Sequence, residues 1–371
     1  MIIYFLVILF LLIGSIYKNR DQVYNLYGDI NGYGYKNDGR FRTVLIGALP
    51  LFLVLGLKSA DVGVDMVAYI YRYDNAIEMM TSSVTSSEMG FNLFNLFFSK
   101  IGVPWQLYLT ICAFILMAGW LIFIRKYSPD SYYSFFIYVT IGLFTMNLSG
   151  IRQSLAIAMC LIALVIYESM YRSKKKKAFV LFELIVLLAA TFHNSAIIFS
   201  VVPFFMRFRF TKRQCLMLLL FASAAILYKN IITDFLPSFE GTRYEEFTYD
   251  EEYGINVLVV LFTIVVPLVS LIFIQPEADN RLSKKITLMF IFASLNVFFT
   301  ILSINNNQLG RVGYYFQPCY LILLPCAINS IKSEEKPMAK FVTTVVCLTY
   351  FILGTMGGTL KIDNYTFFWQ Q

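Results

Sequence analysis

Charged side chains are scarce in this sequence. Only 14% of its 371 residues are Asp, Glu, Lys or Arg, whereas soluble domains average about a quarter. Hydrophobic residues make up 58% of the chain, and the mean hydropathy is +0.66. These proportions exclude a water-soluble protein and predict an all-α, polytopic integral membrane protein. The net charge of +7 is therefore interpreted as a topology signal and not as a nucleic-acid-binding surface.

Metal-binding side chains are also few. The chain has one histidine, His193, and six cysteines, none of them in a CxxC motif. Cys319 and Cys326 share an apolar run, but two helical turns, or roughly 10 Å, separate them, which is too far for a disulfide. We interpret the cysteines as small buried hydrophobes. The sequence predicts no zinc or iron–sulfur site and no cofactor.

Long apolar runs recur along the whole chain, and many approach the length of a spanning helix. We expect about twelve such helices, with roughly eleven to thirteen as the range. The first run has no basic segment before it and no cleavage site after it, so we expect a retained helix and not a signal peptide. The runs are residues 2–17, 43–59, 104–124, 131–147, 151–168, 178–191, 193–206, 214–232, 255–274, 286–304, 312–331 and 338–356.

The connecting segments alternate in charge. Most of the 30 Lys and Arg fall in every second segment, including 173–177 and 207–213, and basic segments stay on the cytoplasmic side. The alternation predicts that both termini face outward and that residues 1–371 form a single transmembrane domain. Two outer segments are long. Residues 59–103 include a short apolar stretch near 90–102 that predicts a re-entrant or interfacial helix, and residues 233–254 form an acidic loop.

Two arginines begin apolar helices on the outer side, where the sorting rule does not favour a cation. They are Arg152, in "NLSGIRQSLAIAM" (147–159), and Arg311, in "NNNQLGRVGYYF" (305–316). Ionisable groups near the hydrocarbon are costly and often mark function. Arginine has a rigid fork that matches phosphate oxygens, and the free N–H groups of the helix that follows Asn147 add positive potential. Together they favour a site for a diphosphate head group.

Simpler explanations remain open for each residue of this outer face. An arginine at a helix end also contacts lipid phosphate by snorkelling. His193, in "TFHNSA", is also typical of an ordinary polar group at a helix junction, and Asp65 is also typical of a helix cap. The outer tyrosines are equally typical of an interfacial aromatic belt.

Five motifs in order resemble a known family. They are "GVDMVAY" (63–69), "SEMGFNLF" (87–94), "SGIRQSLAIAM" (149–159), "TFHNSAIIF" (191–199) and "GRVGYYF" (310–316). This order is similar to that of EpsG-like proteins, a branch of the Wzy-type polysaccharide polymerases, over residues from about 60 to 320. The first motif has "GVD" where "GTD" is more usual.

The resemblance implies a metal-independent glycosyltransferase of the bacterial cytoplasmic membrane. Such enzymes join oligosaccharide repeat units carried on undecaprenyl diphosphate at the outer face, producing capsule, O-antigen or exopolysaccharide. The resemblance implies that Arg152 and Arg311 contact the diphosphate. It leaves the roles of Asp65, Glu88 and His193 undefined.

Glycosyl transfer from a lipid diphosphate sets two chemical tasks. The charge that develops on the leaving diphosphate must be stabilised, and the acceptor hydroxyl must lose a proton. Arg152 and Arg311 suit the first task, and Glu88, His193 and Asp65 are open alternatives for the second. The remaining candidates for substrate contact are Arg72, Tyr69, Asn147, Gln153, Tyr314, Tyr315 and Arg243.

Other functions remain as alternatives. The expected partners are the lipid-linked oligosaccharide, as donor and as acceptor, and a chain-length regulator. An O-antigen ligase or another lipid-linked-sugar transferase would use the same donor, and a flippase would move it. A flippase, however, is expected to have charges in both halves of a central cavity, whereas the polar clusters here lie on one side. A membrane acyltransferase and a non-catalytic scaffold complete the alternatives.

Overall fold

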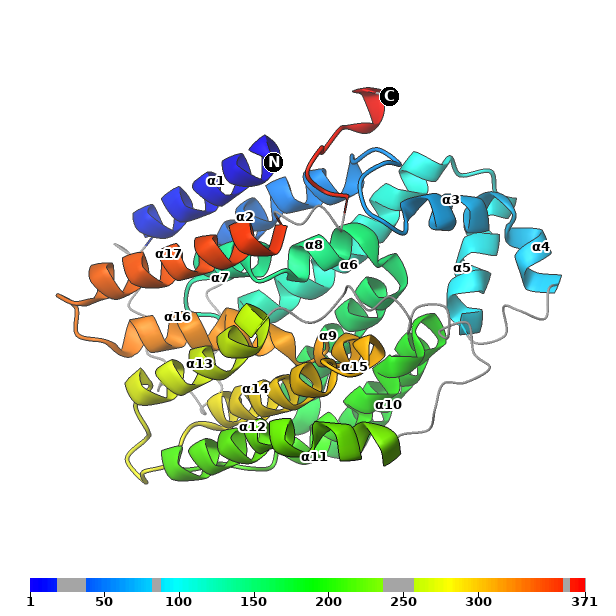
Figure 1. The fold of residues 1–371 in the computed structure, drawn as a ribbon. Helices are drawn as coiled ribbons and strands as arrows, with labels where there is room; N and C mark the ends of the chain where they lie inside the picture. The colour runs from blue at the N-terminus through cyan, green and yellow to red at the C-terminus, as the bar shows by residue number, and fades with distance from the viewer. Residues whose placement is uncertain (19–37, 82–87, 236–256, 356–360, 371) are drawn as a thin grey trace. The chain divides into compact units, whose positions relative to one another are not determined.

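The computed structural model describes residues 1–18, 38–81, 88–235, 257–355 and 361–370, and these residues are mainly helical (Figure 1). Where the sequence predicts one domain, the chain folds into two compact units. Unit 1 comprises Met1–Pro203 with Phe341–Gln371, and unit 2 comprises Phe204–Lys340. The two units are described separately below.

Unit 1 contains the N-terminal helices and most of the last long helix. Within it α9 packs against α6 and α10, α2 packs against α6 and α7, and α5 contacts α3 and α10. Helix α5 matches the short helix predicted near 90–102. The elements are α1 (Ile2–Lys18), α2 (Asp38–Gly56), α3 (Met66–Asp74), α4 (Ala76–Thr81), α5 (Met89–Lys100), α6 (Trp105–Tyr127), α7 (Ser131–Thr140), α8 (Leu143–Ser149), α9 (Ile151–Tyr171), α10 (Lys175–Phe192), η2 (Asn194–Val201), α11 (Val202–Phe205, at the unit boundary), α17 (Lys336–Thr355) and η5 (Phe368–Gln370).

Unit 2 is built around α14. This helix contacts α12, α13, α15 and α16, and its buried Val297 and Ile301 pack with Ala222, Ala225 and Val260. Small residues such as these alanines allow membrane helices to approach closely. The elements are α12 (Lys212–Phe235), α13 (Val257–Phe273), α14 (Lys284–Leu302), α15 (Asn307–Gly313), η4 (Gln317–Cys319) and α16 (Tyr320–Ser330).

The prediction of an all-α polytopic membrane protein is confirmed. Among the described residues six helices are long and apolar enough to cross a membrane, namely α2, α6, α9, α12, α14 and α17, and shorter apolar helices cover 2–17, 194–205 and 257–273. Each predicted run overlaps helix within the described residues, although three runs are not single α-helices. Residues 131–147 divide into α7 and α8, residues 193–206 begin as a 3-10 helix, and residues 312–331 include η4.

These breaks have local causes. Gly142 adopts a φ of 88° between α7 and α8, a left-handed conformation that glycine reaches without steric cost. Pro318 lies at the start of η4, where its missing N–H removes a helical hydrogen bond.

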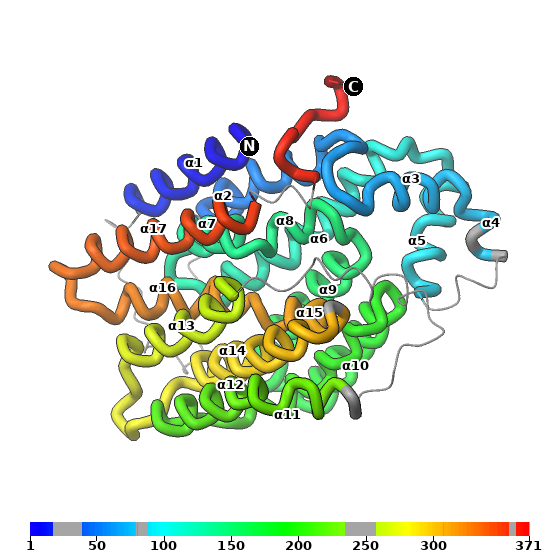
Figure 2. The backbone as a smooth tube through the Cα atoms, viewed as in Figure 1, coloured from blue at the N-terminus to red at the C-terminus, as the bar shows by residue number. Residues whose placement is uncertain are grey.

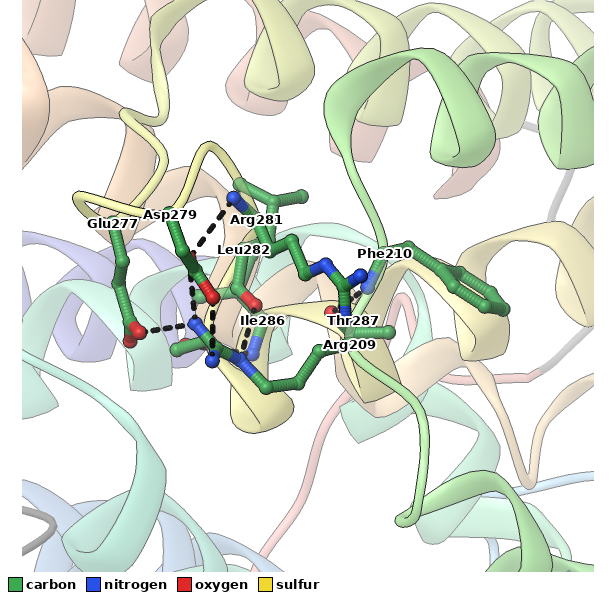
Figure 3. A network of polar contacts seen from close by, with 9 residues as sticks. Arg209, Phe210, Glu277, Asp279, Arg281, Leu282, Ile286 and Thr287 are labelled. Carbon is green, nitrogen blue, oxygen red and sulfur yellow. Dashed lines mark hydrogen bonds and ion pairs between the residues drawn. The ribbon is translucent and has the colours of Figure 1, made fainter.

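In unit 2, the segment before α12 is joined to the segment before α14 by polar contacts (Figure 3). The Arg209 guanidinium forms ion pairs with Glu277 and Asp279, and the Leu282 N–H donates to the Phe210 carbonyl at 2.7 Å. The Arg209 side chain is 25% exposed, and ion pairs of this kind contribute little each. Arg209 thus connects two loops, in addition to its predicted role as a topology signal.

The chain ends meet in unit 1. The Met1 ammonium donates to the Asp363 carbonyl at 2.5 Å, and both ends lie on the same side of this unit (Figure 2). Residues 361–370 also pair with the segment that follows α2, because the Ser59 N–H donates to the Thr366 carbonyl at 2.9 Å and the Phe368 N–H donates to the Leu57 carbonyl at 3.0 Å. The outward orientation of both termini stays a prediction.

Candidate functional site

Glu88 is the centre of a buried cluster of charged side chains in unit 1. It lies at the N-cap position of α5, and its side chain is only 7% exposed. One carboxylate oxygen, Oε2, pairs with Nη1 of Arg152. The other, Oε1, lies 2.8 Å from Nδ1 of His193. The structure therefore brings together three predicted site residues from three separate elements.

The position of Arg152 explains why a carboxylate is needed there. Arg152 is the second residue of α9, where the positive end of the helix dipole disfavours a cation. Burial adds a further cost, since a charge removed from water must be paired. Glu88 offsets both effects. The pairing with a buried carboxylate argues against a side chain that only snorkels to lipid phosphate.

Tyr69 is the fourth member of this cluster. It is buried in α3, and its hydroxyl accepts a long hydrogen bond from Nε of Arg152 at 3.4 Å. The guanidinium carbon lies 5.7 Å from the centre of the Tyr69 ring, within cation–π range. The ring also packs edge-on against Phe91 of α5. Tyr69 thus helps to hold the Arg152 guanidinium in place.

Asp65 contacts Ser149, which lies three residues before Arg152. It occupies the N-cap position of α3, but its side chain makes no capping hydrogen bond. Instead, the Asp65 N–H donates to the Ser149 hydroxyl at 3.3 Å, and that hydroxyl lies 3.4 Å from the Asp65 carboxylate. Ser149 ends α8, just before Arg152. These bonds join the segment of Asp65 and Tyr69 to the start of α9.

Backbone geometry places His193 beside Glu88. His193 is the extended residue between α10 and η2, with φ −154° and ψ 115°, so the helical path of α10 ends there. Helix α5 approaches this turn closely because Gly90 has no side chain. A Cβ on Gly90 would lie 2.7 Å from Cβ of Thr191, nearer than real Cβ atoms come.

The geometry distinguishes Glu88 from His193 among the three candidate bases. A carboxylate only accepts hydrogen bonds, so it favours the tautomer in which Nδ1 of His193 carries the proton and Nε2 has the lone pair. Both oxygens of Glu88 are already engaged with Arg152 and His193. The arrangement is compatible with His193 as the base and Glu88 as the group that orients it, and the choice among Glu88, His193 and Asp65 stays a prediction.

Other predicted residues of unit 1 have structural partners. The buried Asn147 amide donates to the Tyr138 hydroxyl, and Gln153 is buried in α9. Arg72 lies in the last turn of α3. Among the described residues no group of three His, Cys, Asp or Glu side chains is placed to hold a metal ion, and metal independence stays a prediction.

In unit 2, Arg311 is exposed in the short helix α15. Tyr314 follows α15 as its C-cap residue, and Tyr315 is completely buried. The Asn296 amide holds the end of α15 by donating to the Gly313 carbonyl at 3.0 Å. Arg243 and most of the acidic loop 233–254 lie outside the described residues.

The structure adds one residue that the sequence analysis does not single out. Lys58 follows α2, and only 1% of it is exposed. Its ammonium donates to the carbonyls of Val62 and Leu148 and to the sulfur of Met66. The signal that marks Arg152, a cation beside an apolar run on the outer side, also applies to Lys58 and would have found it.

The sequence was compared with protein-family models, curated proteins and solved structures. The family model described as EpsG family matches residues 41–367. No curated protein and no solved structure gives a significant match. Because the matched residues cover most of the chain and include Glu88, Arg152 and His193, the protein belongs to the EpsG family, which is associated with Wzy-type polysaccharide polymerases.

Proposed function

We propose that this protein polymerises oligosaccharide repeat units carried on undecaprenyl diphosphate into a surface polysaccharide, at the outer face of the bacterial cytoplasmic membrane. Membership of the EpsG family supports a polymerase-like role, and the apolar helices support a membrane location. The observation that carries the proposal is the convergence of Arg152, Glu88 and His193.

The reaction forms one bond and breaks one. The acceptor sugar hydroxyl attacks the anomeric carbon of the donor sugar, and the bond from that carbon to the diphosphate oxygen breaks. Nε2 of His193 takes the hydroxyl proton, and Glu88 stabilises the imidazolium that forms. The bonding electrons leave with the lipid diphosphate. No oxidant or reductant is needed.

Arg152 acts on the leaving group. A guanidinium has five N–H donors, and the contacts to Glu88 and Tyr69 involve Nη1 and Nε. Nη2 is then suited to a phosphate oxygen on which charge develops. The assignment of Arg311 to the diphosphate and the presence of a chain-length regulator rest on the sequence alone.

Deleting the gene tests the proposal. Extracted surface and lipid-linked saccharides are separated on a gel, and a plasmid copy of the gene restores the wild type. Loss of a polymerase leaves single repeat units on the carrier or on the lipid core. Loss of a flippase leaves none at the surface, and loss of a ligase leaves long chains on the carrier. Either of the last two patterns would contradict the proposal.

A further inference from the structure

Lys58 is a buried cation that the proposed reaction does not use. The structure places three acceptors around its ammonium, the carbonyls of Val62 and Leu148 and the sulfur of Met66, with Nζ 2.9 Å from the Val62 oxygen. An ammonium has three N–H donors, whereas a neutral amine has two. The three donors of the protonated side chain therefore equal the three acceptors around it. These bonds connect the segment 58–66 with the end of α8.

The C-terminal segment pairs with the chain around this lysine. Phe367 forms an isolated bridge with Lys58, the Ser59 and Thr366 hydroxyls lie 2.7 Å apart, and the Tyr365 hydroxyl donates to the Val54 carbonyl at 2.9 Å. Because Lys58 is only 1% exposed, water does not reach its ammonium, and the protein acceptors must satisfy it.

The acceptor on α8 is close to the candidate site in sequence. Leu148 lies in the last turn of α8, where helix carbonyls lack helical partners and attract cations. Arg152 follows four residues later. The opposite segment is pressed against the same carbonyl, because a Cβ on Gly63 would lie 2.6 Å from the Leu148 oxygen. Asp65 and Tyr69, which contact Ser149 and Arg152, follow on that segment.

We propose that Lys58 is a positioning residue, which locks the junction of α8 and α9 against the segment of Asp65 and Tyr69 and so holds Arg152 toward Glu88. Its effect on polymer synthesis rests on the proposed function. Its effect on the junction itself does not.

Burial gives this lock a pH dependence. It lowers the pKa of Lys58 from its ordinary value of 10.5 to about 7, and the nearby Asp65 carboxylate acts in the opposite direction. Between these two values the unfolded chain binds more protons than the folded one, so stability rises with pH across that window. The same sign holds for opening of the junction alone, because an exposed Lys58 regains its ordinary pKa, and the neutral amine still donates two N–H bonds. We therefore expect the junction to be held more tightly as the pH rises above about 7.

Two substitutions test the positioning role, Lys58→Met and Lys58→Arg, with Lys100→Met as the control at an exposed lysine of α5. Hydrogen exchange of amides 147–155 is measured in detergent, with α6 as the internal reference. Lys58→Met is expected to accelerate exchange at the junction at least about tenfold and to reduce polymer synthesis by a similar factor. Lys58→Arg keeps a permanent cation, so the tightening of the junction with rising pH should disappear. The Lys100→Met protein should match the wild type.

Unchanged exchange and synthesis in Lys58→Met would overturn the proposal. If that protein fails to accumulate, Lys58→Arg decides alone, and a wild-type tightening of the junction with pH in that variant would also overturn the proposal. If the wild-type protein makes no polymer, the proposed function fails, and exchange at the junction still decides the role of Lys58.

Discussion

The Glu88 carboxylate is the residue on which the geometry of the candidate site depends. It pairs with Arg152 through one oxygen and with His193 through the other. The sequence singles out all three residues because each is an ionisable group beside an apolar run. It leaves the choice of base among Glu88, His193 and Asp65 open, because orientation depends on distances between residues far apart in the chain.

We predict that Glu88→Gln reduces polymer synthesis by about 10²–10⁴-fold, the usual contribution of general acid–base catalysis. The neutral amide removes the charge that pairs with Arg152, and its NH₂ group competes with Nδ1–H of His193 for the same space. Synthesis is measured in proteoliposomes with lipid-linked repeat units. Glu78→Gln, at an exposed residue of α4, is the control and should behave as wild type. Retention of more than half the activity by Glu88→Gln would exclude Glu88 from the site.

At the scale of elements, the apolar runs predict where helices lie but not where they break. The predicted run 43–59 continues past Gly56, where α2 ends, because composition does not show that Lys58 leaves the helix to reach the Leu148 carbonyl. The break at Gly142 is similarly hidden, since a glycine inside an apolar run is compatible with a continuous helix. The short helix at 90–102 was predicted from its length.

The approach of α5 to the end of α10 depends on Gly90. We predict that Gly90→Ala destabilises the protein by about 1–3 kcal/mol, as overpacking does, and reduces polymer synthesis because Glu88 moves with α5. Gly39→Ala is the matched control, since Gly39 is also the second residue of a helix and a Cβ there meets nothing within 4 Å. The thermal unfolding midpoint in detergent provides the comparison. Equal midpoints for the two variants would show that α5 does not need this contact.

For the whole molecule, composition is sufficient to predict an all-α membrane protein, because so apolar a chain has few other solutions. The division into two compact units was not predicted. Long apolar helices occur in both units, so composition does not mark a boundary at Pro203, and the division depends on which helices pack together.

The alternation of basic segments predicts the topology. Reporter fusions at Lys175 and Arg209 should behave as cytoplasmic, and fusions at Glu246 and Asn306 should behave as exported. Alkaline phosphatase and green fluorescent protein fusions give complementary readouts. A cytoplasmic signal at Glu246 would show that the membrane orientation is opposite to the prediction. It would also contradict the proposed side of the reaction.

Metal independence can be tested on the purified protein. We predict that polymer synthesis in proteoliposomes continues in excess EDTA, because Arg152 supplies positive charge to the leaving diphosphate. Activity that is lost to EDTA and restored by Mg²⁺ or Mn²⁺ would instead indicate that carboxylates such as Asp65 and Glu88 bind a metal.

The Arg152→Lys substitution tests whether the candidate site carries out the proposed reaction. Polymer synthesis is assayed in proteoliposomes with lipid-linked repeat units. Lysine keeps the charge but has a point-like ammonium without the planar fork, so it cannot hold Glu88 and a phosphate oxygen in the same geometry. A charge-assisted contact of this kind is worth roughly 2–4 kcal/mol, or about 30- to 1000-fold in rate. Arg172→Lys, at an exposed arginine that follows the other end of α9, is the control. We predict that the Arg152→Lys protein inserts at normal levels and makes no long chains, while the Arg172→Lys protein makes a normal ladder. Near-normal polymer from Arg152→Lys would contradict a role for this guanidinium in the reaction.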